Sequence, residues 1–202
     1  LQLLTQEIQN LETKEDPDSD DLDQLEALVR SRNVVTGSFV QIIKGKSVSP
    51  TKELLLVLLE AEQCYNDITR RLAKDLISEM GDTVAAHLSQ MAIEYPSKAI
   101  RKSAVKHLGA LGDKNFITVF HQILKNKNES PEVLYEVIVA LEEMLSPQIL
   151  PVLKTATQTN SAQVRMYAAR LIGQLKAVDA IDDLMRLFAD SNSYVSGQAQ
   201  LA

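Results

Sequence analysis

Apolar residues recur at helical spacing along the C-terminal two thirds of the chain, and the pattern repeats. One run places Ile100, Ala104, Leu108 and Leu111 on a single helical face, because they stand at i, i+4, i+8 and i+11. A second apolar run follows each first run after a short break. The sequence therefore predicts successive pairs of helices from about residue 65, in units of 31–33 residues.

The units keep their register when the chain is compared with itself at an offset of 64 residues. Matched pairs include Ile100 with Val164, Arg101 with Arg165, Ala104 with Ala168, Leu108 with Ile172, Gly109 with Gly173, Leu111 with Leu175, Ile117 with Ile181, Phe120 with Leu184, Ile123 with Leu187 and Leu124 with Phe188. The copy between them departs at Leu134, where the outer copies have arginine, and at Glu142, where they have glycine.

A single helix pair has an apolar face too large to bury alone, so neighbouring pairs must stack on one another. We predict an all-α fold, an α-solenoid of antiparallel helix pairs. The predicted repeats are 65–96, 97–129, 130–160, 161–192 and a partial unit at 193–202. Gly109 and Gly173 are expected where two helices approach closely. Asp82 and Asp113 follow glycines that can end helices, and we expect both to cap the next helix.

The first 64 residues follow this pattern poorly. Residues 1–31 predict an N-terminal helix, an acidic linker and a second helix. Residues 32–64 predict short helices, and whether these form a degenerate leading repeat stays open. The first helix has an apolar seam at Leu1, Leu4, Ile8 and Leu11, which favours docking on the rest of the chain and leaves self-association through residues 1–13 open. The second helix is expected to bury Leu22, Leu25, Leu28 and Val29.

The charge of the chain is concentrated near its beginning. The net charge is −6, and residues 1–30 contribute nine acidic against two basic side chains. No segment has the basic excess that is typical of proteins that bind nucleic acid. The longest aliphatic run, residues 54–59, is far shorter than the roughly 20 residues that cross a bilayer. The chain starts without Met and stops inside an apolar segment, so we expect it to be part of a longer protein.

Two motifs that suggest a ligand lack residues that the corresponding binding loops require. Asp16, Asp18 and Asp20 alternate as in a calcium loop, but the sixth and twelfth positions of that loop hold Asp21 and Ala27 instead of Gly and Glu. Residues 45–47 read Gly-Lys-Ser, yet Val40 stands where a phosphate-binding loop needs its first glycine. We therefore predict no metal and no cofactor.

No set of residues predicts catalysis. His87, His107 and His121 lack the spacing of a metal site, and we expect all three on helix surfaces. Cys64 is the only cysteine, so it forms no internal disulfide, and we expect a buried or incidental thiol. A single cysteine also suits a reducing compartment. We predict that the chain is not an enzyme.

The segment from Gln163 to Leu175, Gln-Val-Arg-Met-Tyr-Ala-Ala-Arg-Leu-Ile-Gly-Gln-Leu, resembles a HEAT repeat of the short kind found in phycobilisome lyase subunits. The segment from Ile100 to Asp113 is similar. In that family an Asp often precedes the Val-Arg pair and joins a polar ladder between repeats. Asn160 stands near that place here, so the resemblance implies a weakened ladder.

The resemblance also implies that second helices line the concave face of the solenoid. Exposed positions on these helices then form a polar, mixed surface with room for a peptide or protein, although they could serve only solubility. The predicted face consists of Asn115, Thr118, Gln122, Gln148, Pro151, Thr155, Asp179, Asp182 and Arg186.

The function expected from these observations is a non-catalytic scaffold module for protein–protein interaction, in the cytoplasm or on the cytosolic side of a membrane protein. Resemblance alone supports the alternative of a bilin lyase subunit. DNA binding, which some HEAT-like DNA glycosylases show, fits least because the chain has neither tryptophan nor a basic stripe.

Overall fold

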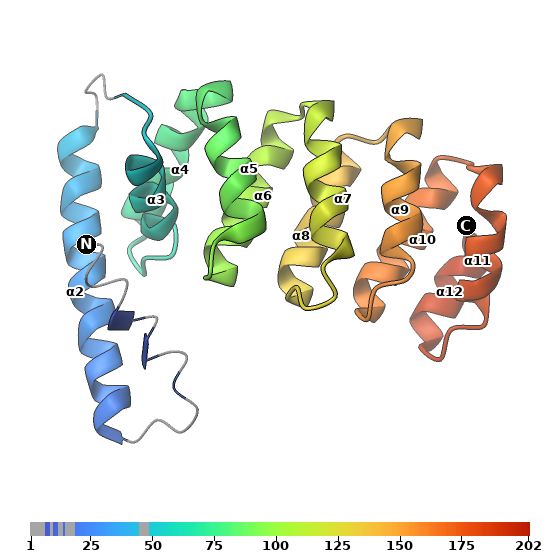
Figure 1. Cartoon of the computed structure of the whole chain (residues 1–202), viewed down its shortest axis with the longest axis horizontal. Helices are drawn as coiled ribbons and strands as arrows, with labels where there is room; N and C mark the ends of the chain where they lie inside the picture. The colour runs from blue at the N-terminus through green and yellow to red at the C-terminus, as the bar shows by residue number, and fades with distance from the viewer. Residues whose placement is uncertain (1–6, 9, 12–13, 15–18, 45–48) are drawn as a thin grey trace. The chain divides into compact units, whose positions relative to one another are not determined.

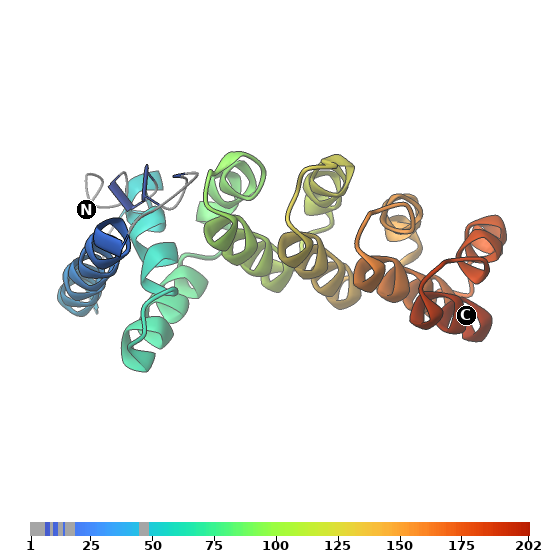
Figure 2. The same cartoon turned by 90° about the horizontal axis from the view of Figure 1, so that it is seen from below.

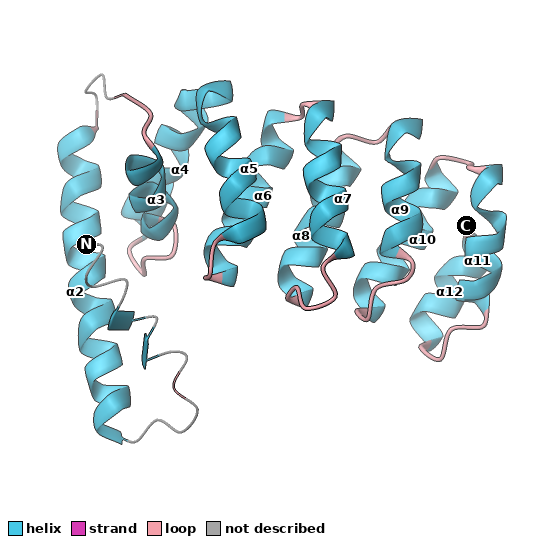
Figure 3. Ribbon diagram, in the orientation of Figure 1, coloured by secondary structure: helices cyan, strands magenta, loops and turns pink. Residues whose placement is uncertain are grey.

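The computed structural model describes residues 7–8, 10–11, 14, 19–44 and 49–202. Within these ranges all regular structure is helical (Figure 3), which confirms the predicted all-α class. Contacts divide the chain into two compact units, Leu1–His87 and Leu88–Ala202, and the boundary falls inside α5 (Ala85–Glu94). No helix in the described ranges is both long and apolar enough for a membrane crossing.

In the first unit, the described residues between 19 and 84 contain three packed helices followed by a 3-10 turn. Helix α2 contacts α3 and α4, and α3 also contacts α4. Their bounds are α2 Ser19–Ile43, α3 Lys52–Ala61, α4 Asp67–Met80 and η1 Gly81–Val84.

Helix α2 differs from the sequence prediction. It is one helix of 25 residues that runs through the expected boundary at residue 31. No proline lies between Pro17 and Pro50 to stop it, so the segment stays helical where shorter helices were predicted.

The buried positions of α2 also differ from those expected. Leu22 is 53% exposed, and Leu25, Leu28 and Val29 are only half-buried. The fully buried residues lie later in the helix, at Thr36, Val40 and Ile43. At this end α2 lies against α4, where a Cβ on Gly37 would come 3.2 Å from the Thr69 hydroxyl. Contact with α3 and α4, rather than the strength of the apolar pattern, decides which part is buried.

Several predictions for the N-terminal part lie outside the described residues. They concern Leu1 and Leu4, most of the acidic stretch, and the Gly-Lys-Ser sequence at 45–47. Of the predicted seam, Ile8 is 1% exposed and Leu11 is half-buried. The burial of Ile8 favours docking of this segment on the rest of its own unit.

The second unit is built from repeating helix pairs. The first helices of the pairs are α6 Lys98–Leu111, α8 Pro131–Glu143, α10 Ala162–Gln174 and α12 Ser193–Leu201. The second helices are α7 Ile117–Lys125, α9 Leu150–Ala156 and α11 Ile181–Phe188. A 3-10 turn precedes each second helix: η2 Lys114–Phe116, η3 Pro147–Ile149 and η4 Val178–Ala180.

These helices form two layers within the second unit (Figures 1 and 2). Helices α6, α8, α10 and α12 pack successively on one another in one layer, while α7 packs on α9 in the other. Fully buried apolar side chains from both layers, among them Leu108, Phe120 and Leu141, fill the space between them. This linear stacking is the predicted α-solenoid arrangement.

The glycine predictions are confirmed where helices meet. A Cβ on Gly109 would lie 2.7 Å from the Ala140 Cβ, so only glycine permits the observed distance between α6 and α8. Gly173 is equally close to Ala202. Of the two predicted capping residues, Asp113 accepts a hydrogen bond from the Asn115 amide. The prediction for Asp82 is wrong, because it lies inside η1 rather than before it.

Candidate functional site

The nine residues predicted to face a partner come from three second helices and the turns before them, all in one layer of the second unit (Figure 2). We call this set the second-helix face. Eight of the nine residues are exposed, and Thr155 is half-buried. The exposed members are Asn115, Thr118, Gln122, Gln148, Pro151, Asp179, Asp182 and Arg186.

Thr155 is half-buried because it connects two second helices. Its hydroxyl lies 2.9 Å from Nε2 of His121, so α7 and α9 share a hydrogen bond. Burial lowers the pKa of His121, and the nearby positive charge of Lys125 lowers it further. The imidazole is therefore kept neutral near neutral pH, which suits an uncharged hydroxyl partner.

A charged cluster connects α9 with α11. The Lys154 Nζ donates to the carbonyl oxygen of Asp179 at 2.5 Å and lies 3.6 Å from Oδ2 of Asp183. Arg186 also pairs with Asp183. The predicted face includes Asp179 and Arg186 but not Asp183, which is only 5% exposed. Asp183 stands three residues after Ala180 and four before Leu187, both buried, so helical spacing places it on the buried face and could have identified it.

An arginine near the start of α6 ties together two loops. Arg101 donates from Nε and Nη2 to the two carboxylate oxygens of Glu129, at 2.9 and 2.7 Å. Its Nη1 donates to the backbone carbonyls of Tyr95 and Pro96, at 2.7 and 2.8 Å. Such bidentate, charge-assisted bonds are the strong class of side-chain hydrogen bonds. Glu129 is 7% exposed and was not predicted.

The same arrangement recurs in α10. Arg165 donates from Nε and Nη2 to Asp190 at 2.7 and 2.9 Å, and from Nη1 to the carbonyls of Thr159 and Asn160 at 2.9 and 3.1 Å. These hydrogen bonds from Arg165 hold the pKa of Asp190 below its usual value. We call each arrangement an Arg–acid clamp. In both clamps the acid comes from the loop after the second helix of the same predicted repeat. The ladder that the resemblance implies uses an acid before the Val-Arg pair, where Asn160 stands, so its expected weakness stays a prediction.

The repeat between the two clamps lacks both partners. Leu134 takes the place of the arginine, and the uncharged Asn160 immediately precedes the cap of the next helix, as Glu129 does one repeat earlier. Each clamp arginine donates to the backbone carbonyls of the residues six and five positions before it. For Leu134 these positions are Asn128 and Glu129, and the leucine side chain has no donor for their carbonyls.

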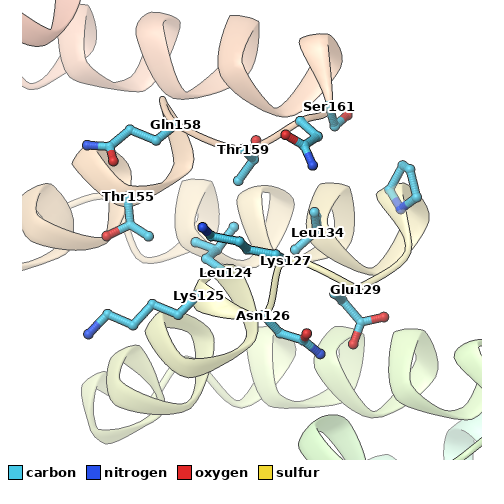
Figure 4. A pocket seen from close by; sticks show the side chains of 12 residues that line it. Leu124, Lys125, Asn126, Lys127, Glu129, Leu134, Thr155, Gln158, Thr159 and Ser161 are labelled. Atoms are coloured by element: carbon cyan, nitrogen blue, oxygen red, sulfur yellow. The ribbon is translucent and has the colours of Figure 1, made fainter.

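A pocket of about 580 Å³ lies at this place, between two successive loops of the second unit (Figure 4). We call it the middle-repeat pocket. Its volume is within the range of sites for small ligands or peptide side chains. It is lined by Leu124, Lys125, Asn126, Lys127, Glu129, Pro131, Leu134, Thr155, Gln158, Thr159, Asn160 and Ser161.

The middle-repeat pocket combines an apolar base with a cationic rim. Leu124 and Leu134 are 5% and 6% exposed, whereas Lys125 and Lys127 are exposed. Only Thr155 of these lining residues belongs to the predicted face. The departure at Leu134 was visible in the sequence, but a cavity produced by a missing side chain depends on the distance between two loops and could not be inferred from it.

The described residues contain no group of three or more His, Cys, Asp or Glu that could hold a metal ion. Cys64 is buried as expected, and burial raises the pKa of its thiol. Its Sγ lies 3.3 Å from Oδ1 of Asn33. The prediction of a surface position is wrong for His107, which is 5% exposed. It lies in α6, whose side chains are covered by α8 on one side.

Comparisons with known proteins agree with the architecture. The family model for HEAT repeats matches residues 117–202. Among solved structures, the X-ray structure of YibA from E. coli is similar, with a TM-score of 0.52 and 18% sequence identity. That match covers 98% of this chain and 71% of YibA, and at this identity it supports the fold alone. No curated protein sequence matches the chain.

Proposed function

We propose that the second-helix face binds a partner protein, because the family model that matches residues 117–202 describes HEAT repeats, which generally mediate protein–protein interaction. The observation that carries this proposal is the exposure of eight of the nine face residues on one layer of the second unit. An extended array of polar side chains on a rigid helical layer can accept a peptide or a helix through hydrogen bonds.

The proposed role is a non-catalytic scaffold or regulatory module, and the cytoplasm, or the cytosolic side of a membrane protein, is the compartment in which we expect it to act. Bilin attachment stays a prediction from resemblance, because no feature of the described residues favours it. Self-association through residues 1–13 also stays a prediction, since most of that segment lies outside the described residues.

The test is affinity capture with the full chain as bait. A face variant replaces Gln122, Gln148 and Asp182 by Arg, one exposed residue from each of three repeats. We expect proteins recovered by the native chain to be lost from this variant, because three added cations and longer side chains disrupt polar contacts on the face.

A matched control replaces Gln163, Gln174 and Glu143 by Arg. These residues are exposed on first helices, and the change in charge is identical. The control should recover the same proteins as the native chain. Equal recovery by the native chain and the face variant would remove the second-helix face from the proposal.

A further inference from the structure

We propose that the middle-repeat pocket binds an acidic segment of a partner protein, with an apolar side chain at the base and carboxylates at the rim. This inference rests on the proposed function and adds to it the chemistry of the partner. The pocket exists because the middle repeat omits the Arg–acid clamp that both neighbouring repeats contain.

The comparison with the clamped repeats shows what the omission leaves open. Arg101 and Arg165 each extend from the start of a first helix to two loops, and their guanidinium groups occupy the space between them. At Leu134 the side chain is shorter and apolar, and the loops that line the pocket, residues 125–131 and 155–161, have no such bridge. The space is thus a regular feature of the repeat from which the usual side chain is missing.

The charge of the lining residues selects the class of ligand. Lys125 and Lys127 are the cationic residues of the pocket, and Glu129 is its sole acidic lining residue. The Glu129 carboxylate is already bound by Arg101 on both oxygens. An arginine from a partner would find no available carboxylate and would be repelled by two lysines, so the pocket favours anionic groups.

The shape of the pocket adds an apolar requirement. Leu124 and Leu134 form an almost fully buried base, and Pro131 stands beside them. In Figure 4 the Lys127 side chain extends from its loop toward Leu124 and Thr155. A leucine-sized side chain that enters here removes apolar surface from water, while flanking carboxylates reach the two ammonium groups.

The position of the pocket argues for a protein ligand. Thr155 lines the pocket and also belongs to the second-helix face. A partner segment that lies on α9 beside Thr155 can therefore reach the pocket. The two surfaces form one continuous site, in which the face supplies polar contacts and the pocket supplies charge and an apolar anchor.

The test is an NMR titration of the full ¹⁵N-labelled chain at low salt with three five-residue probe peptides, capped at both ends. Their sequences are Glu-Asp-Leu-Asp-Glu, its amide analogue Gln-Asn-Leu-Asn-Gln and the basic analogue Lys-Arg-Leu-Arg-Lys. We expect the acidic peptide to shift amide signals of residues 124–131 and 155–161, and to bind about tenfold more tightly than the amide analogue. The shifts should decrease as salt is added.

Charge variants localise the effect. Replacing Lys125 and Lys127 by Glu should abolish binding of the acidic peptide. Replacing Lys74 and Lys106 by Glu makes the same change in charge at exposed helical positions outside the pocket, and binding should be unchanged. Equal loss in both variants would show a general charge effect and overturn the proposal.

A filled variant tests the origin of the pocket. Leu134→Arg combined with Asn160→Asp introduces a third clamp, which should fill the pocket and abolish the shifts while the chain stays folded. If this variant does not fold, the comparison of the two charge variants still decides whether the pocket lysines bind the acidic peptide.

Three results contradict the proposal: the amide peptide binds as tightly as the acidic one, the basic peptide binds more tightly, or the acidic peptide still binds a folded filled variant. If the acidic peptide does not bind while the face variant still loses its partner proteins, the proposed ligand of the pocket is wrong and the proposed function stands.

Discussion

Replacing Arg165 by Met tests how much the Arg–acid clamp stabilises the second unit. Methionine keeps most of the aliphatic stem of the side chain, so the substitution removes chiefly the guanidinium. It leaves the Asp190 carboxylate without its charged partner and the carbonyls of Thr159 and Asn160 without their donor.

The expected loss in the free energy of unfolding follows from the burial of the ion pair. The side chains of Arg165 and Asp190 are 16% and 10% exposed, and breaking a buried ion pair by removing one partner costs about 3–5 kcal/mol. The residual exposure admits water, and Asp190 keeps its hydrogen bond from the Asn192 amide. We therefore expect a loss of about 2–3 kcal/mol in the free energy of unfolding.

Urea unfolding followed by far-UV circular dichroism measures this loss, and amide hydrogen exchange in α10 shows that the effect arises in the second unit. The matched control is Arg186→Met, since the Arg186 side chain is 59% exposed and its pair with Asp183 should contribute less than about 1 kcal/mol. A loss of unfolding free energy in Arg165→Met no larger than that in Arg186→Met would contradict a stabilising clamp.

Three further results are expected. Gly109→Ala should destabilise the chain by about 1–3 kcal/mol in thermal unfolding, because its Cβ would clash with Ala140, whereas Gly197→Ala meets no atom within 4 Å and should be neutral or slightly stabilising. Cys64 should react with a thiol reagent slowly in the native chain and rapidly in urea, and rapid native reaction would contradict its burial. The pKa of Asp190 is depressed in the folded state, so its contribution is present above the unfolded value of about 3.9 and is lost as the pH falls through the folded value. The difference in the free energy of unfolding between the native chain and Arg165→Met should therefore decrease as the pH of the measurement is lowered towards 3.

The sequence predicted most of the fold of the second unit because its information is local and repeated. Apolar spacing located the helix pairs, and the matched position of Gly109 predicted a close approach of α6 and α8. The prediction for α2 was wrong, because no local signal in the sequence shows how far the helix continues beyond residue 31 or which part of it another helix covers.

The candidate site could be predicted only in part. Exposed positions on second helices follow from spacing, whereas the acids that pair with the arginines do not. Glu129 lies 28 residues after Arg101, but Asp190 lies 25 residues after Arg165, so the two pairs fall out of register with each other. The pocket at Leu134 depends on the absence of both the arginine and its acid from one repeat, and the resulting cavity becomes visible only when the loops are placed in space.

Two repeats of the second unit are clamped, and the repeat between them is open. Double-mutant cycles in urea unfolding test it most directly, because they isolate the coupling free energy of each pair. We predict coupling of at least about 1 kcal/mol for Arg101 with Glu129 and for Arg165 with Asp190, no coupling between Leu134 and Asn160, and new coupling when Arg and Asp are introduced at those two positions. Equal coupling at all three sites of the native chain, or none at either arginine, would contradict the account.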